Sequence, residues 1–131
     1  MTVYIGEADR RWQSVEVRGA RMEKSPVFEG DYDVRSAYFR MPAGCGVPPH
    51  DHSKWVQVAV LAGRMQVEQE GRPAHVVGAG ECYFVMAGET HVETALDDTL
   101  LLVTQGEDRP GMGLAAGGAS VREAPTRGDR A

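Results

Sequence analysis

Residues 44–63 read GCGVPPHDHSKWVQVAVLAG, and this stretch decides how the rest of the chain is arranged. Two histidines, His50 and His52, stand one residue apart directly before an apolar run. In an extended segment, residues i and i+2 point to the same face, so these two imidazoles can chelate one divalent cation. Pro48 and Pro49 fix φ and remove two amide donors, which stiffens the approach to His50.

A second stretch supplies a third imidazole. Residues 78–94 read GAGECYFVMAGETHVET and place His91 shortly after a Gly-containing turn. The chain has four histidines, and three of them lie in these two stretches. The fourth, His75, follows the turn signal EGRP at 70–73, and we interpret it as a surface residue. The sequence therefore predicts one metal site built from both stretches.

The two stretches resemble the paired motifs of the cupin family. Their spacings are Gly-x5-His-x-His-x10-Gly over 44–63 and Gly-x5-Met-x-Gly-x2-His over 80–91, and the resemblance covers residues 36–105. It implies an all-β fold, a cupin-type antiparallel β-barrel with double-stranded β-helix or jelly-roll topology. It also implies that the histidines point into the barrel and hold a metal ion.

The chain departs from the family pattern at three positions. Val56 stands where cupins usually carry a metal-binding glutamate, Met86 replaces a proline and Ala95 an asparagine. Gln57 follows Val56 and should face the other way on an even strand, although a one-residue bulge would turn it inward as a fourth ligand. The resemblance thus implies a neutral three-histidine site. Its expected ligands are His50, His52 and His91.

Three protein ligands leave coordination positions open. Closed structural zinc sites are usually four-coordinate and rich in cysteine, so this pattern favours a metal that reacts or binds a ligand. Imidazole suits iron, zinc, manganese and nickel, and we expect one such divalent ion, with iron or zinc favoured. Cys45, five residues before His50, is a weaker candidate ligand.

The resemblance suggests three functions. The first is an Fe(II) dioxygenase similar to the cupins that cleave diketones or flavonols. The second is a zinc-type cupin that cyclises or isomerises polyketide-like compounds. The third belongs to another class, a non-catalytic module that senses a ligand or metal. The chain has no DNA-binding helical segment, so a sensor would need a separate partner.

The expected pocket is mostly apolar, which favours a small hydrophobic or aromatic substrate. Two residues are catalytic candidates. Gln57 could orient the substrate, and Glu93, on the same strand face as His91, could act as a general base or orient a metal ligand. Ordinary core packing remains the alternative for most of the apolar candidates. The expected substrate contacts are Tyr38, Arg40, Trp55, Val58, Val60, Phe84, Met86 and Leu102.

The composition excludes several classes of protein. The chain has 131 residues, 42% hydrophobic and 25% charged, which suits one soluble globular domain. A net charge of −5 argues against non-specific binding to nucleic acid or anionic membrane. No apolar run approaches the ~20 residues of a membrane helix, and the start lacks the apolar core of a signal peptide. We therefore expect a cytoplasmic location with Cys45 and Cys82 as free thiols.

Turn-punctuated alternation predicts about nine to eleven short strands over residues 1–105 and no long helix. We expect Pro26 to interrupt a strand near 20–28 and residues 29–33 to form a turn. Residues 106–131 are rich in Gly and Pro and should form a strap or a disordered tail. The N-terminal strands within residues 1–30 could mediate a homodimer.

Overall fold

The computed structural model describes residues 2–106 and, within that range, contains ten strands and one turn of 3-10 helix, η1 (Glu7–Asp9). The last strand ends at Gly106, one residue beyond the predicted domain boundary. The predicted tail otherwise lies outside the described residues. Among residues 2–106, no helix is long and apolar enough to cross a membrane.

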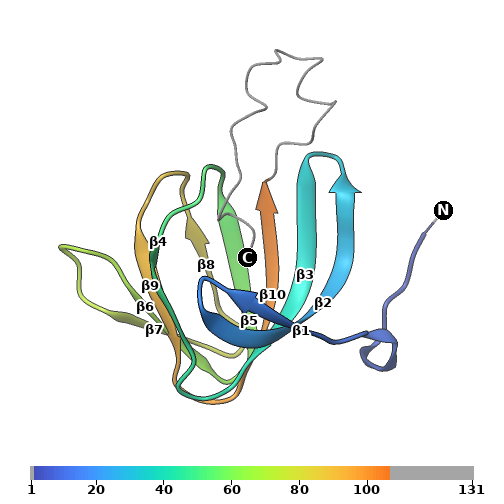
Figure 1. The fold of residues 1–131 in the computed structure, drawn as a ribbon, viewed down its shortest axis with the longest axis horizontal. Coiled ribbons are helices and arrows are strands. Elements are labelled where there is room, and N and C mark those ends of the chain that lie inside the picture. The colour runs from blue at the N-terminus through green and yellow to red at the C-terminus, as the bar shows by residue number, and fades with distance from the viewer. Residues whose placement is uncertain (1, 107–131) are drawn as a thin grey trace, which may run out of the picture.

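The strands form two antiparallel sheets that face each other (Figure 1). The six-stranded sheet has the order β1 (Gln13–Val17), β2 (Ala20–Asp31), β3 (Val34–Met41), β10 (Thr99–Gly106), β5 (Val56–Ala62) and β8 (Cys82–Val85). The four-stranded sheet has the order β4 (Gly46–His50), β9 (His91–Ala95), β6 (Arg64–Glu68) and β7 (His75–Gly78). The predicted all-β jelly-roll architecture is confirmed, as two sheets rather than one continuous closed barrel.

The core lies between the sheets and follows from alternation along the strands. On β5, Val56, Val58 and Val60 are at most 3% exposed, whereas Gln57 between them is exposed. From the opposite sheet Met65 of β6 is completely buried. Full burial of such a side chain contributes roughly 1.5–3 kcal/mol. The inward residues of both sheets thus form one apolar layer, and His50, His52 and His91 are buried as well.

The hairpin between β1 and β2 places an arginine near this layer. Arg18 (φ 49°) and Gly19 (φ 92°) both adopt left-handed backbone conformations, and Val17 pairs with Ala20 across them. Two-residue turns of this kind match the twist of antiparallel strands. The turn brings Arg18 beside the loop that follows β4.

The strand β2 differs from its prediction. It runs without a break from Ala20 to Asp31 and passes through Pro26, because a register irregularity between Pro26 and Phe28 accommodates the missing amide donor. The predicted turn at 29–33 is correspondingly shorter, since β2 continues to Asp31 and only the next two residues connect it to β3.

A bulge in β4 sets the direction of the His50 side chain. Val47 pairs with Glu93 and His50 pairs with His91, so three steps on β4 match two on β9. Pro48 and Pro49 stand against the single residue Val92, at positions where no ladder hydrogen bond is required. The bulge resets the alternation, and both Val47 and His50 are buried although they are three residues apart. This bulge was not predicted from the sequence.

Candidate metal centre

The structure brings His50, His52 and His91 together. His50 lies directly opposite His91 in the β4–β9 ladder, and His52 follows two residues later in the next loop. The three residues are 6%, 4% and 1% exposed. Each offers one ligand nitrogen, and these three atoms all lie within 4.8 Å of one another. One cation can therefore contact all three imidazoles.

A backbone hydrogen bond connects the two loops that flank the histidines. The amide of Gly88 donates to the carbonyl of His52 at 2.9 Å. Gly88 has φ 83°, a left-handed conformation that glycine adopts without strain. In the same turn, the Met86 amide donates to Oε1 of Glu89 at 2.9 Å. The loop bearing His52 is thus held against the turn that leads to His91.

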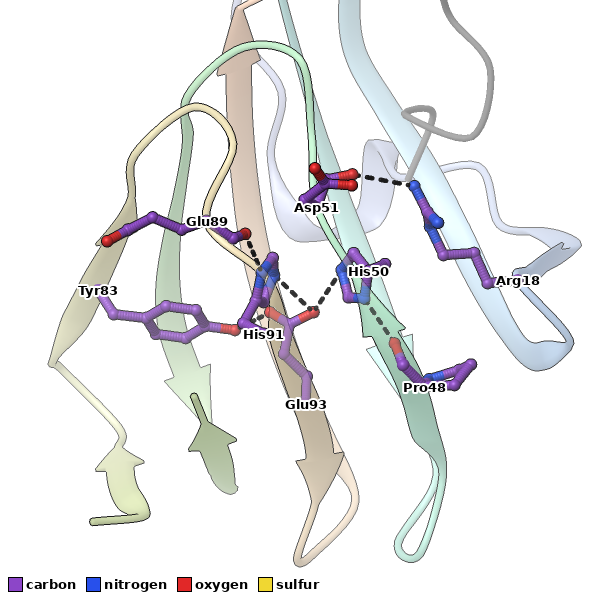
Figure 2. A network of polar contacts seen from close by, with 8 residues as sticks. All are labelled: Arg18, Pro48, His50, Asp51, Tyr83, Glu89, His91 and Glu93. Atoms are coloured by element: carbon purple, nitrogen blue, oxygen red, sulfur yellow. Dashed lines mark hydrogen bonds and ion pairs between the residues drawn. The ribbon is translucent and has the colours of Figure 1, made fainter. Parts of the chain in front are cut away.

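Hydrogen bonds also fix the tautomers of two ligands. Nδ1 of His50 lies 2.7 Å from the carbonyl oxygen of Pro48, and Nδ1 of His91 lies 3.4 Å from that of Glu89 (Figure 2). A carbonyl oxygen only accepts, so this geometry assigns the proton to Nδ1 and leaves a lone pair on Nε2. Burial also lowers the pKa of His50 to about 4, which keeps its imidazole neutral. Neutral imidazoles oriented by carbonyl oxygens suit a divalent transition metal.

A carboxylate approaches the same nitrogens. Glu93, whose side chain is 14% exposed, places Oε1 3.6 Å from Nε2 of His50 and 3.7 Å from Nε2 of His91. Its other oxygen, Oε2, accepts a hydrogen bond from the hydroxyl of Tyr83 (Figure 2). Burial, with the charge and hydrogen bond of Glu93, raises the pKa of Tyr83 well above its ordinary value, so the phenol stays protonated. Glu93 was among the residues predicted from the sequence, whereas Tyr83 was not.

An apolar cavity of about 40 Å³ adjoins the histidines. This volume is large enough for about three water molecules. Arg18 lines it from the β1–β2 hairpin, and Nη2 of Arg18 donates to the carbonyl of Asp51 at 3.3 Å (Figure 2). Arg18 was not among the residues predicted from the sequence. The other lining residues are Val17, Met22, Phe39, Met41, Val47, His50, His52, Val56, Val58, Glu93, Leu101 and Val103.

Of the apolar residues expected to contact substrate, only Val58 lines this cavity. Val60 is fully buried in the core. Leu102 belongs to the opposite face of β10, because its neighbours Leu101 and Val103 point inward. The predictions for Val60 and Leu102 are therefore corrected. Val60 packs in the core, and Leu101 and Val103 line the cavity instead of Leu102.

The predicted substrate contacts Trp55, Phe84 and Met86 also lie outside the cavity. Phe84 is 51% exposed and Met86 is 59% exposed. The ring of Trp55 stacks on that of Phe84, with 5.6 Å between the centroids. Tyr83 and Val85 occupy the inward positions of β8 instead, so the face assignment for Phe84 was wrong by one residue. None of the three predicted residues lines the cavity beside the histidines.

Tyr38 and Arg40 lie on the outer face of β3, because Phe39 and Met41 point into the cavity. The guanidinium carbon of Arg10 lies 4.1 Å above the ring of Tyr38. Arg40 lies 3.8 Å above the ring of Trp12 and forms an ion pair with Glu23 at 2.8 Å. Their assignment as substrate contacts is therefore corrected, and Arg18 is the arginine that reaches the cavity.

Gln57 is exposed, and the inward position belongs to Val56, which is 3% exposed. Gln57 pairs with Thr104 and Phe84 where the register of β5 is regular. The irregularity of this ladder lies farther along, between Leu100 and Leu101. The bulge that would have made Gln57 a fourth ligand is absent from this part of β5, and its outward position removes the basis for a catalytic role.

Replacing Gln57 with alanine should therefore leave metal binding unchanged within about twofold, because an exposed substitution away from the site usually alters stability by at most about 0.5 kcal/mol. Zinc titration and thermal unfolding of Gln57→Ala check this. A tenfold loss of zinc affinity would show that Gln57 reaches the metal.

The remaining candidate ligands lie elsewhere. Cys45 and Cys82 are free thiols in the structure, and Sγ of Cys45 donates to the carbonyl of Arg21 at 3.5 Å. Cys45 does not belong to the group of ligand atoms formed by His50, His52 and His91. His75 is exposed on β7.

The pattern of the two motifs extends over most of the described chain. The cupin domain family model matches residues 37–104. The chain belongs to the cupin family. No curated protein matches this cupin.

Several solved structures share the cupin fold. The polyketide cyclase RemF from Streptomyces resistomycificus is 24% identical with a TM-score of 0.71, over 84% of this chain and 82% of RemF. A predicted oxalate decarboxylase from Thermotoga maritima is 18% identical with a TM-score of 0.70, over 80% of this cupin and 99% of that chain. KdgF from Halomonas sp. is 22% identical with a TM-score of 0.67, over 82% and 96%. Likeness at these identities shows the fold alone.

Proposed function

We propose that this cupin is a metal-dependent enzyme that acts on a small, largely apolar substrate through an anionic oxygen of that substrate, such as an enolate. The observation that carries the proposal is the group of three buried histidines, His50, His52 and His91, beside an apolar cavity. Their neutral nitrogens would leave the charge of a bound dication uncompensated by the imidazoles, which favours an anionic ligand.

Our first candidate reaction is oxidative cleavage by an Fe(II) dioxygenase. Histidine nitrogens with a carboxylate nearby and open positions are typical of non-haem Fe(II) oxygenases. A bound divalent ion supplies Lewis acidity toward the substrate oxygen, and iron adds reactivity toward dioxygen. With a 1,3-dicarbonyl, one carbon–carbon bond breaks and each fragment gains one oxygen atom of dioxygen. The substrate supplies all the electrons, so no external reductant is consumed.

The residues around the cavity would bind and orient such a substrate. Phe39, Val58 and Leu101 offer hydrocarbon surface for its apolar part and exclude water from the reacting atoms. Arg18 adds a positive charge to the same cavity and favours a substrate with an anionic group. The small volume requires that a larger substrate extends past Arg18 or displaces the hairpin that carries it.

A second candidate is a zinc-dependent cyclase or isomerase of polyketide-like compounds. The similarity to the polyketide cyclase RemF, at a TM-score of 0.71, favours it. In this case the bound metal supplies Lewis acidity only, and dioxygen is not consumed. The two candidates therefore differ in a quantity that can be measured directly.

Metal-free protein reconstituted under nitrogen with Fe(II) or with Zn(II) should separate them. The probes are 2,4-pentanedione and 1-phenyl-1,3-butanedione, followed by oxygen electrode and by the absorbance of their enols. We expect one dioxygen consumed for each diketone lost with iron, and none with zinc. Lack of oxygen uptake with iron on these probes and on aromatic enols would contradict the dioxygenase. Conversion of a polyketide-like probe by the zinc form would support the second candidate.

A further inference from the structure

We infer that Glu93 is the fourth protein ligand of the metal and that Tyr83 is the residue that positions it. This inference rests on the metal site of the proposed function and adds the carboxylate that the first motif lacks. In this chain the family's glutamate position is the buried Val56 of β5. The carboxylate comes instead from β9 in the facing sheet, two residues after His91.

The distances from Glu93 to His50 and to His91 match those between ligands of one cation. With metal–ligand bonds of 2.0–2.2 Å, neighbouring ligand atoms of a tetrahedral site lie about 3.3–3.6 Å apart. Oε1 of Glu93 lies 3.6 Å from Nε2 of His50 and 3.7 Å from Nε2 of His91. A single oxygen therefore faces both nitrogens at nearly the separation that a shared metal requires (Figure 2).

The arrangement is not explained by hydrogen bonds between these residues. The Nδ1 atoms of His50 and His91 are directed at carbonyl oxygens, so their protons are committed there. Each Nε2 consequently presents a lone pair to Oε1 of Glu93, and three electron-rich atoms face one another without a hydrogen between them. A cation bound between these three atoms would accept their lone pairs and remove the repulsion.

Tyr83 determines which carboxylate oxygen is available. Its hydroxyl donates to Oε2 of Glu93, which leaves Oε1 directed at the histidines. Metal-binding carboxylates are usually held by such an outer hydrogen bond. A dication held by three imidazoles and one carboxylate would keep a net charge of +1, which would still favour an anionic group on the substrate. This assigns Glu93 a ligand role in place of the general-base role that the sequence suggested.

Zinc affinity and the visible spectrum of the cobalt-loaded protein test the inference in the full chain. Glu93→Gln keeps the shape of the side chain and should weaken zinc binding by about a hundredfold or more, because it removes a ligand and not only an outer partner. It should also shift the cobalt d–d bands, which report the ligand set. Tyr83→Phe should weaken zinc binding about ten- to a hundredfold with little change in those bands. Zinc affinity and cobalt bands of Glu93→Gln equal to wild type would overturn the inference.

A relocation experiment keeps the test independent of folding defects in one variant. Val56→Glu, combined with Glu93→Gln, returns a carboxylate to the family position on a residue that lines the same cavity. We expect zinc affinity within about tenfold of wild type, since the ligand count is restored. Glu93→Asp, shorter by one methylene, should bind zinc more weakly than wild type. Unchanged affinity in Glu93→Asp together with no rescue by Val56→Glu would refute the assignment.

The outcome for the wild-type chain separates this inference from the proposed function. If wild-type protein does not bind zinc or iron, the proposed metal enzyme itself is wrong. If wild-type protein binds zinc and the Glu93 variants bind it equally well, only the assignment of Glu93 fails.

Discussion

His91→Ala is expected to abolish the retention of metal through purification. His91 is 1% exposed and contributes one ligand nitrogen to the histidine cluster. Structural zinc sites with four protein ligands are worth about 10–16 kcal/mol, so each ligand contributes about 3 kcal/mol, or on the order of a hundredfold in affinity. His50→Ala should have the same effect because the two residues face each other across β4 and β9. Elemental analysis and zinc titration measure the loss.

His75→Ala is the matched control for these variants. It removes the same imidazole from an exposed position on β7, outside the histidine cluster. It should bind metal as wild type does. Circular dichroism of the metal-free proteins must show the same β-sheet signal for all three variants. Loss of metal from His75→Ala would mean that the ligands are wrongly assigned.

Gly63→Ala should destabilise the fold strongly, and more than Gly80→Ala does. A Cβ at this position would lie 2.4 Å from the carbonyl oxygen of Asp98 and 2.8 Å from Cα of Thr99, both backbone atoms. The residue also has φ +87°, a conformation that costs an L-residue about 1–2 kcal/mol. Strain and overpacking together should lower the free energy of unfolding by about 3–5 kcal/mol. For a domain of this size the melting temperature would fall by roughly 10–20 °C.

Gly80→Ala separates the two causes. Gly80 has nearly the same φ, +88°, but a Cβ there meets no heavy atom within 4 Å. Its cost should be the conformational one alone, about 1–2 kcal/mol. Thermal and denaturant unfolding of both variants give the comparison. Equal losses for Gly63→Ala and Gly80→Ala would show that the approach to Asp98 and Thr99 is not tight.

The sequence predicted side-chain directions correctly where the spacing between residues determines which face of a strand they occupy. The single residue between His50 and His52, and the paired motif pattern, predicted ligands on one face that meet His91, and the structure places them together. The resemblance to cupins implied that Val56 points inward, and strand alternation then predicted that Gln57 points outward, as observed. These inferences needed no knowledge of which strands are neighbours.

The prediction of which residues point inward failed on strands where apolar and polar residues do not alternate. β10 begins TLLLVTQ, and three consecutive leucines do not indicate which of them is inside. Leu101 points into the cavity because Thr99, Val103 and Gln105 share its face in the pairing with β3 and β5. The choice of Leu102 was therefore wrong by one residue, and β8 produced the same error at Phe84.

Tertiary contacts between distant segments were beyond sequence reasoning. Arg18 and Tyr83 reach the site only through the β1–β2 turn and the facing of the two sheets, and no local motif marks them. The bulge at the prolines of β4 likewise depends on the partner strand β9. Glu93 could be selected because it lies two residues from His91, but its approach to His50 appears only in three dimensions.

Anomalous diffraction from a zinc-loaded crystal of the wild-type protein tests the central claim most directly. The account predicts one strong peak about 2.0–2.2 Å from a nitrogen of each of His50, His52 and His91, with Oε1 of Glu93 at a similar distance. A peak bound by other residues, or none between these three imidazoles at saturating zinc, would contradict it.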